Sequence, residues 1–364
     1  MNSKHTTLDT PVGGTTMKFG VIRGNGIGPE IVEATKYVLE ATGLAIEWVH
    51  IPVAEEAVKE YGHPLPQESI NALKEVKVAF KGPLIVDKMR GRITCVHDDG
   101  SEDTYPSINN AIRRELKLFV CPRPIRGVLN ISGKYENLDV TIMREITEDV
   151  YSGLEHKIGD VAAEGIKLTT REAVERVTRY SFDFARKNGR KLVTCAHKAN
   201  ALSFTDGLFL KCFREVAKEY PEIESNDYMI DATCYSLVKF PEKFDIIVAS
   251  NQYGDILSDL AAGLAGSLGL APGGNIGEHA SVFEASHGAA DDIAGLGIAN
   301  PAALILSGAL MLRHIGNTVE ATKVEESTRN VLSRGKVLTP DLGGTATTME
   351  FAEAITKEVE AYSR

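Results

Sequence analysis

The segment from Phe244 to Leu264 carries the residues best suited to chemistry. Its apolar residues 246–249 predict a core strand, and Asp255 and Asp259 follow four residues apart, on one face of a predicted helix. Two carboxylates at this spacing repel each other unless a cation lies between them. Ligands of α/β proteins bind at the carboxyl ends of strands. We therefore interpret the pair as metal ligands rather than as a solvated acidic helix end.

Two glycine-containing segments are candidates for binding a nucleotide. The first, GNGIGPE at residues 24–30, ends a predicted strand and opens a helix, so its backbone N–H groups could bind an anion. The dinucleotide fingerprint GxGxxG is absent, which argues against a Rossmann domain. The second segment, residues 284–301, places a histidine, an acidic pair and several glycines in one loop before an apolar helix at residues 302–312. Such a loop could wrap a nucleotide.

Strand-like and helical stretches alternate along the chain and must position these residues. Apolar runs at residues 19–22, 78–80, 192–195 and 246–249 predict strands, and residues 29–41 and 171–187 predict helices. This alternation indicates an α/β fold with much of the sheet parallel. Residues 151–169 lack a helical period and predict a small β arm.

Composition and charge exclude several classes of protein. The chain has 364 residues, 43% of them hydrophobic, and a net charge of −10 without a basic block, so no nucleic-acid partner is expected. No apolar run reaches the length of a membrane span, so no membrane partner is expected either. The five cysteines form no CxxC pair and suit a reducing compartment, which predicts a cytoplasmic protein. Residues 1–16 are interpreted as a flexible leader.

Four motifs taken together resemble the β-decarboxylating dehydrogenases, the family of isocitrate, isopropylmalate, homoisocitrate and tartrate dehydrogenases. They are GNGIGPE (24–30), NQYGDILSDLAAGLAGSLGLAPGGNIG (251–277), HGAADDIAGLGIANP (287–301) and DLGGTATTMEFAEAI (341–355). The resemblance implies the α/β, isocitrate/isopropylmalate dehydrogenase-like two-domain fold, which is non-Rossmann and has a small β clasp arm. It places the large domain at residues 17–117 and 266–364, and the small domain at 118–265 with the arm at about 149–170. It also implies NAD, Mg²⁺ or Mn²⁺, and a homodimer or higher homo-oligomer.

The resemblance also assigns catalytic and metal-binding roles. Lys198 matches the lysine that takes the hydroxyl proton, and Tyr151 matches the tyrosine that protonates C3 after decarboxylation. Asp231, Asp255 and Asp259 match the metal carboxylates. In the family, the lysine and the first aspartate reach across from the second subunit, which implies shared active sites.

Substrate and cofactor residues follow from the same resemblance. Ser107, Asn109 and Arg113 reproduce the SxNxxxR pattern of isocitrate enzymes, which predicts a tricarboxylate substrate, and Arg123 and Arg144 match two further substrate arginines. The matching cofactor contacts are Asn200, His287, Gly288, Asp292, Ile293 and Asn300. Because a carboxylate at Asp292 would accept hydrogen bonds from ribose hydroxyls and repel a 2′-phosphate, NAD is expected rather than NADP.

Two departures from the family pattern keep the substrate open. Ile146 stands where isocitrate enzymes have Asn, and residues 86–106 form a long charged link containing Lys88, Arg90, Arg92 and His97. One interpretation of the link is a β-hairpin that turns at residues 98–100. The link is either a solvated surface insertion or a segment that reshapes the site for a different anionic substituent.

Three hypotheses follow for the function. The first is an NAD-dependent isocitrate dehydrogenase, the activity found in the tricarboxylic acid cycle. The second is the same chemistry on another 2-hydroxy acid, such as homoisocitrate, isopropylmalate or a phosphonate analogue of isocitrate. The third is a non-catalytic regulatory subunit, which the presence of Lys198, Tyr151 and the three aspartates disfavours.

Overall fold

The computed structural model describes residues 16–85, 92–97, 99–131 and 133–362. The leader expected at residues 1–16 lies outside these ranges except for its last residue, as do Lys88, Arg90 and Asp98 of the charged link. None of the helices in the described ranges combines the length and apolar character that a membrane span needs.

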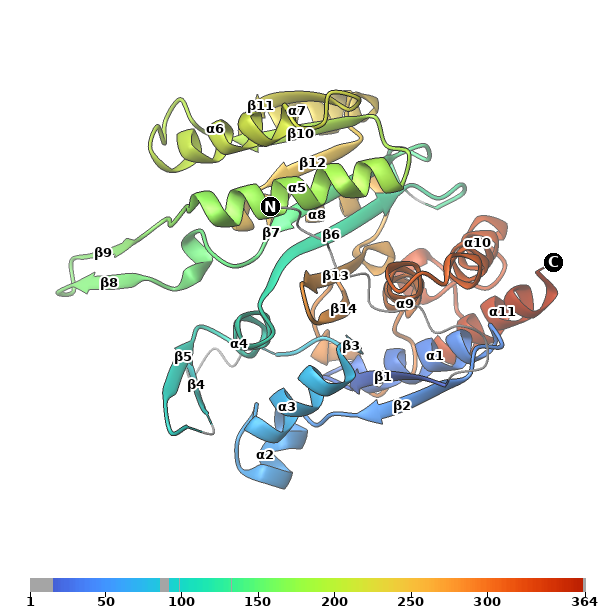
Figure 1. The fold of residues 1–364 in the computed structure, drawn as a ribbon. Helices are drawn as coiled ribbons and strands as arrows, with labels where there is room; N and C mark the ends of the chain where they lie inside the picture. The colour runs from blue at the N-terminus through green and yellow to red at the C-terminus, as the bar shows by residue number, and fades with distance from the viewer. Residues whose placement is uncertain (1–15, 86–91, 98, 132, 363–364) are drawn as a thin grey trace.

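One ten-stranded mixed sheet runs through the molecule (Figure 1). Its strands lie in the order β11 (Glu224–Met229), β10 (Leu192–His197), β12 (Ile246–Ala249), β7 (Asp139–Glu145), β6 (Leu118–Arg126), β13 (Pro272–Gly277), β14 (Ser281–Ala285), β3 (Val78–Lys81), β1 (Met17–Ile22) and β2 (Ile46–His50). The β6–β7, β6–β13 and β13–β14 pairs are antiparallel, and the outer pairs on both sides are parallel. The prediction of a largely parallel α/β sheet is therefore confirmed, with an antiparallel centre.

Helices cover both faces of this sheet. They are α1 (Gly28–Glu40), α2 (Glu55–Tyr61), α3 (Gln67–Val76), α4 (Ile108–Glu115), α5 (Arg171–Lys187), α6 (Thr205–Ala217), α7 (Ile230–Lys239), α8 (Asn251–Ala265), α9 (Ala302–His314), α10 (Thr318–Arg334) and α11 (Thr348–Ala361). Short 3-10 turns are η1 (Val150–Ser152), η2 (Pro241–Lys243), η3 (Leu268–Leu270), η4 (Asp291–Ile293) and η5 (Pro340–Leu342). The helix predicted at residues 171–187 has the predicted bounds.

The apolar core is divided into three clusters. The largest joins residues of α1, α5, α6 and α9 to the sheet. A second lies under α3 and α4, and a third under α7 and α8. Strands β6 and β7 both contact α8, and β6 also contacts α4, so polar residues on β6 lie near both helices.

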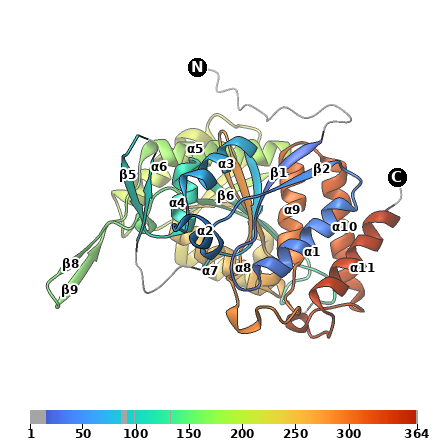
Figure 2. The same cartoon turned by 90° about the horizontal axis from the view of Figure 1, so that it is seen from below.

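Two hairpins stand apart from the main sheet. The predicted β arm is the antiparallel pair β8 (Glu155–Ile158) and β9 (Ala162–Gly165), which projects away from the body of the molecule (Figure 2). The charged link forms the antiparallel pair β4 (Ile93–Val96) and β5 (Glu102–Tyr105), which bears out the hairpin interpretation for the described part of that link.

Candidate active site

Two arginines lie side by side at the centre of the sheet. Cys121 pairs with Arg144 and Arg123 pairs with Ile142 in the β6–β7 ladder, so the two arginines are diagonal neighbours on one face. Both side chains are almost completely buried. Buried guanidinium groups need anionic or polar partners, and α8 supplies them.

Helix α8 presents its polar face to these arginines. Arg144 donates from Nε and Nη2 to Asn251 Oδ1, at 3.0 and 2.8 Å, and pairs with Asp255 through Nη1. Arg123 Nη1 lies 3.2 Å from Asp255 Oδ1 and 2.5 Å from Ser258 Oγ. A side chain at position 254 would come within 2.7 Å of the Arg144 Cβ atom, so Gly254 allows this close approach.

Asp255 and Asp259 lie together and suit a divalent cation. Asp259 Oδ1 is 3.6 Å from Arg123 Nη1, and half of its side chain is exposed. Partial burial and the negative charge of Asp255 raise the pKa of Asp259, although Arg123 opposes this. A bound cation would relieve the repulsion between the two carboxylates, and carboxylate oxygen is the ligand that Mg²⁺ and Mn²⁺ prefer. The residues present therefore fit the metal that the sequence predicted.

A group of charged side chains that are mostly buried lies beside Arg113 of α4. Arg113 donates from Nε to Asn275 Oδ1 at 3.0 Å and lies 3.5 Å from Glu284, which also pairs with the buried Lys81. Burial opposes ionisation of Glu284, but Lys81 and Arg113 outweigh it and lower its pKa to about 2. Sequence reasoning missed Lys81, Asn275 and Glu284 as site residues. For Lys81 and Glu284 a signal was available, since each is a charged residue at the carboxyl end of an apolar strand.

The three predicted substrate arginines converge on one region. Burial and the positive charges of Arg123 and Arg113 lower the pKa of Arg144 to about 10. Arg123 Nε is buried without a hydrogen-bond partner in the described structure. A polyanion placed here would relieve the mutual repulsion and satisfy this donor.

Ser107 and Asn109 lie at the start of α4, ahead of Arg113. Ser107 is the N-cap, and its hydroxyl accepts the Asn110 N–H at 3.2 Å. The Asn109 Oδ1 atom is buried and finds no partner among the described residues. An unpaired buried amide oxygen is costly, and a bound ligand could satisfy it.

Tyr151 lies in η1, over the arginine cluster. The guanidinium carbon of Arg144 is 5.7 Å from the centre of the Tyr151 ring. Partial burial and the negative charge of Asp255 raise the pKa of the Tyr151 phenol. The phenol therefore holds its proton at neutral pH, as a general acid must.

Lys198 and Asp231 form a separate pair. Lys198 Nζ lies 2.7 Å from Asp231 Oδ1, and most of the Asp231 side chain is exposed. Asn200 is exposed in the turn that follows Lys198. No contact between this pair and Asp255, Asp259 or Tyr151 is found in the part of the chain that the structure describes. The three predicted metal aspartates are therefore divided between two groups.

The predicted cofactor residues lie on the loop before α9. Burial lowers the pKa of His287, and its Nε2 atom is buried without a partner among the described residues. Asn300 donates to Asp341 at 3.0 Å, and Ile293 packs against the main core. Gly288 and Asp292 are exposed. This loop has exposed backbone and one unsatisfied imidazole, which fits a nucleotide that binds along it.

The glycine-rich turn at residues 24–30 supports that loop rather than presenting free N–H groups. The N–H groups of Asn25, Ile27 and Gly28 are bonded to backbone carbonyls, and Ile27 donates to Ala289 at 2.9 Å. Glu30 accepts the Gly297 N–H at 2.9 Å. These three N–H groups are therefore engaged within the protein, as in a tight turn, and are not free to bind an anion. A hollow lined by Arg23, Asn25 and Asp291 lies where the turn meets the loop.

The charged hairpin and Ile146 form one structural feature. Ile146 is buried and shares the core cluster under α4 with Ile93 and Cys95 of β4. The hydrophobic residue at position 146 thus packs with the hairpin. Arg92, at the base of the hairpin, donates to the carbonyl of Gly153 beside η1. His97 contacts Asp103 and Glu115, so it ties the hairpin to α4.

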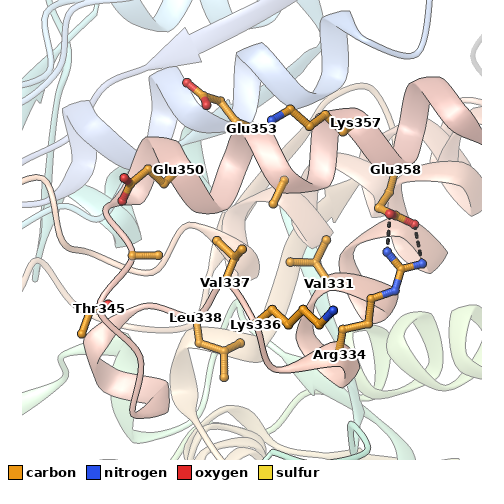
Figure 3. A pocket seen from close by; sticks show the side chains of 12 residues that line it. Val331, Arg334, Lys336, Val337, Leu338, Thr345, Glu350, Glu353, Lys357 and Glu358 are labelled. Atoms are coloured by element: carbon orange, nitrogen blue, oxygen red, sulfur yellow. Dashed lines mark hydrogen bonds and ion pairs between the residues drawn. The ribbon is translucent and has the colours of Figure 1, made fainter.

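A hollow between α10 and α11 lies away from all these residues. Charged side chains of both signs line it, and Arg334 Nη2 pairs with Glu358 at 3.0 Å (Figure 3). None of the predicted site residues contributes to its lining.

Comparison with known proteins agrees with this geometry. Residues 18–355 match the family model described as isocitrate/isopropylmalate dehydrogenase. A 3-isopropylmalate dehydrogenase of Archaeoglobus fulgidus is 46% identical over 93% of this chain and 98% of its own length. A probable mitochondrial NAD isocitrate dehydrogenase subunit alpha of Drosophila melanogaster is 41% identical over 93% of this chain and 87% of its own. The crystal structure of isocitrate dehydrogenase from Methylococcus capsulatus superimposes with a TM-score of 0.87 at 43% identity, covering 94% of this chain and 99% of that one.

These matches span the sheet, the arginine cluster and the loop before α9 together. Members of this family use NAD and Mg²⁺ or Mn²⁺ as cofactors. The chain therefore belongs to the isocitrate/isopropylmalate dehydrogenase family, whose chemistry is the metal-dependent oxidative decarboxylation of a hydroxy acid.

Proposed function

We propose that the chain is an NAD-dependent isocitrate dehydrogenase that converts isocitrate to 2-oxoglutarate and CO₂. The observation that carries this proposal is the convergence of Arg113, Arg123 and Arg144: Arg123 and Arg144 share the Asp255 carboxylate, and Arg113 is bonded to Asn275 of β13, the strand next to β6. Three guanidinium groups in one region suit a polyanionic substrate, and Ser107 and Asn109 ahead of Arg113 reproduce the pattern of the isocitrate enzymes. The polar or charged side chains of Asn275, Glu284 and Lys81 lie beside Arg113. An alkyl substituent of the substrate would gain little binding free energy from contact with them.

The residues have the following roles in the proposed reaction. Lys198 of a second subunit, as the neutral amine, accepts the proton of the C2 hydroxyl, while the hydride on C2 leaves with its electron pair. The bond between C3 and its carboxylate then breaks, CO₂ departs, and the electron pair forms an enolate. Tyr151 gives its proton to C3. When bound, NAD accepts the hydride, and a divalent cation at Asp255 and Asp259, with Asp231 of a second subunit, polarises the C2 oxygen.

The separation of Lys198 and Asp231 from the other site residues supports a homodimer or larger assembly with shared active sites. The Asp231 side chain is 65% exposed and the Lys198 side chain 27% exposed, so part of the pair is available to a second copy of the chain. We further propose that the two-domain division falls at about residues 117 and 265, where β6 begins and α8 ends, and that the protein is cytoplasmic.

Isopropylmalate is the second candidate substrate, because the Archaeoglobus relative is a 3-isopropylmalate dehydrogenase at 46% identity. The hairpin contact between Arg92 and Gly153 also brings a feature outside the usual family pattern next to the Tyr151 turn.

The test is NADH formation by the purified protein with Mn²⁺ and NAD. Isocitrate, homoisocitrate, isopropylmalate and a phosphonate analogue of isocitrate are compared at equal concentrations. We expect isocitrate to have the highest kcat/KM. Lys198→Ala should lower kcat by about 10²- to 10⁴-fold, the usual contribution of a general base. Lys211→Ala, an exposed lysine of α6, is the matched control. Preferred turnover of another acid would refute the isocitrate assignment, and turnover of none would refute catalysis by this chain alone.

A further inference from the structure

Lys167 is a buried cation to which the proposed reaction gives no role. It lies between β9 and α5, at the base of the projecting arm, and only 13% of its side chain is exposed. Its Nζ atom is 2.9 Å from Asp149 Oδ1, 3.2 Å from Ser250 Oγ and 3.4 Å from Asp206 Oδ1. Asp149 and Ser250 each accept a hydrogen bond from the ammonium group, Asp206 forms an ion pair with it, and the centre of the Tyr253 ring lies 4.4 Å from Nζ.

Each of these three partners lies in, or is hydrogen-bonded to, a segment that carries a candidate catalytic or metal-binding group. Asp149 is the N-cap of η1, which contains Tyr151. Ser250 is the N-cap of α8, which carries Asp255 and Asp259. Asp206 accepts the backbone N–H of Lys198 through Oδ2 at 2.6 Å. One ammonium group thus joins the three segments on which the proposed chemistry depends.

The surroundings of Asp149 show why a cation is needed at this point. Asp149 has a left-handed backbone with φ of 75°, which is uncommon for a residue with a side chain and is kept only where contacts enforce it. Its second carboxylate oxygen accepts the Gln252 N–H at 3.0 Å, and its own N–H donates to the Leu168 carbonyl at 3.0 Å. Asp149 and Asp206 are both buried, so two carboxylates would remain uncompensated without Lys167.

We propose that Lys167 is a positioning residue whose ammonium group sets the turns carrying Tyr151 and Lys198 against the start of α8. Lys167 does not contact the reacting atoms. It acts through Asp149, Asp206 and Ser250, and the proposal rests on the roles given above to Tyr151 and Lys198. Displacement of a catalytic group by about 1 Å can lower a rate by about 10²-fold. Loss of the ammonium group should therefore affect turnover far more than substrate binding.

The test compares Lys167→Met with Lys157→Met, which removes an exposed lysine of β8 in the same arm. Both variants are assayed with Mn²⁺, NAD and the substrate that the wild type prefers, and the dissociation constant of the Mn²⁺–substrate complex is measured by titration without NAD. We expect Lys167→Met to lower kcat by about 10- to 100-fold while the dissociation constant changes less than about threefold. Lys167→Arg, which keeps the charge, should recover part of kcat. Lys157→Met should match the wild type.

A second variant tests the proposal even if Lys167→Met does not fold. Ser250→Ala removes one acceptor, and the Ser250 side chain makes no capping hydrogen bond to α8, so this variant should fold even if Lys167→Met does not. We expect a several-fold lower kcat for Ser250→Ala. A kcat equal to that of the wild type in Lys167→Met, or in Ser250→Ala if Lys167→Met fails to fold, would overturn the proposal. So would a loss confined to substrate binding. An inactive wild type would instead overturn the proposed function.

Discussion

The arginine cluster and the Lys198–Asp231 pair are built in opposite ways. Arg123 and Arg144 are buried on β6 and β7 and are held by Asn251, Asp255 and Ser258 of α8. Lys198 and Asp231 contact each other across a largely exposed surface. Side chains of the same chain surround the first group, whereas in the second group most of the Asp231 side chain is exposed. The difference indicates that a single chain completes one part of the catalytic machinery and offers the other part to a partner.

Mixed dimers would test this division most strongly. Lys198→Ala and Tyr151→Phe should each lose about 10²- to 10⁴-fold in kcat, because each removes a proton-transfer group. We consider the case in which Lys198 and Tyr151 of one chain serve different active sites. A dimer of one Lys198→Ala chain and one Tyr151→Phe chain then has one intact site. Activity should then return to about a quarter of the wild-type value, since about half of the dimers are mixed and each has one working site.

The measurement is NADH formation by the co-purified mixture, with each single variant as a control. A mixture as inactive as its components would mean that Lys198 and Tyr151 of one chain serve the same active site. It would remove the basis for active sites shared between subunits.

The two groups should also differ in their contribution to stability. Arg144→Met leaves the Asn251 Oδ1 atom without its partner and leaves Asp255 with Arg123 alone, and it should lower the free energy of unfolding by about 3–5 kcal/mol. Lys198→Met should leave the unfolding midpoint almost unchanged, because exposed ion pairs contribute little. Urea denaturation at one protein concentration compares the variants. A more stable Arg144→Met would mean that repulsion among the three arginines outweighs the contacts of Arg144 with α8.

A smaller effect is expected from Glu148, a buried carboxyl group near Tyr151. It precedes Asp149 and lies against Glu145, and burial together with these carboxylates raises its pKa to about 7 from an ordinary value of 4.5. The folded protein keeps this proton after the unfolded chain has lost it. The free energy of unfolding should therefore decrease as pH rises from about 4.5 to about 7, by at most about 3 kcal/mol from this group.

Glu148→Gln should remove that decrease and keep the acceptor for the Thr170 N–H, which lies 2.7 Å from Glu148 Oε1. The measurement is the unfolding midpoint at pH 5, 6, 7 and 8, with Glu155→Gln on the exposed arm as the matched control. Parallel pH curves for Glu148→Gln and the wild type would show that Glu148 ionises normally in the folded protein.

Local features of the fold were predictable from the sequence. The strand at residues 246–249 and the helix at residues 171–187 have the predicted bounds, because apolar periodicity and flanking polar residues act within one element. The four-residue spacing of Asp255 and Asp259 similarly places them on one helix face before any tertiary contact is considered. The predicted hairpin in the charged link follows the same rule, since its turn is local.

Contacts between distant elements were decided only by the tertiary structure. The meeting of Arg113 with Asn275 and Glu284 depends on β13 and β14 lying between β6 and β3, an order that no local pattern encodes. By sequence, the N–H groups of the glycine-rich turn could bind an anion, but in the folded protein three of them are bonded to backbone carbonyls. The packing of Ile146 with the hairpin and the contacts of Lys167 also involve residues on other elements, so they could not be predicted from local sequence. Sequence alone determined which groups could do chemistry, whereas the packing of the sheet against α4 and α8 determined which of them meet, because burial and pairing of charge depend on residues far apart in the chain.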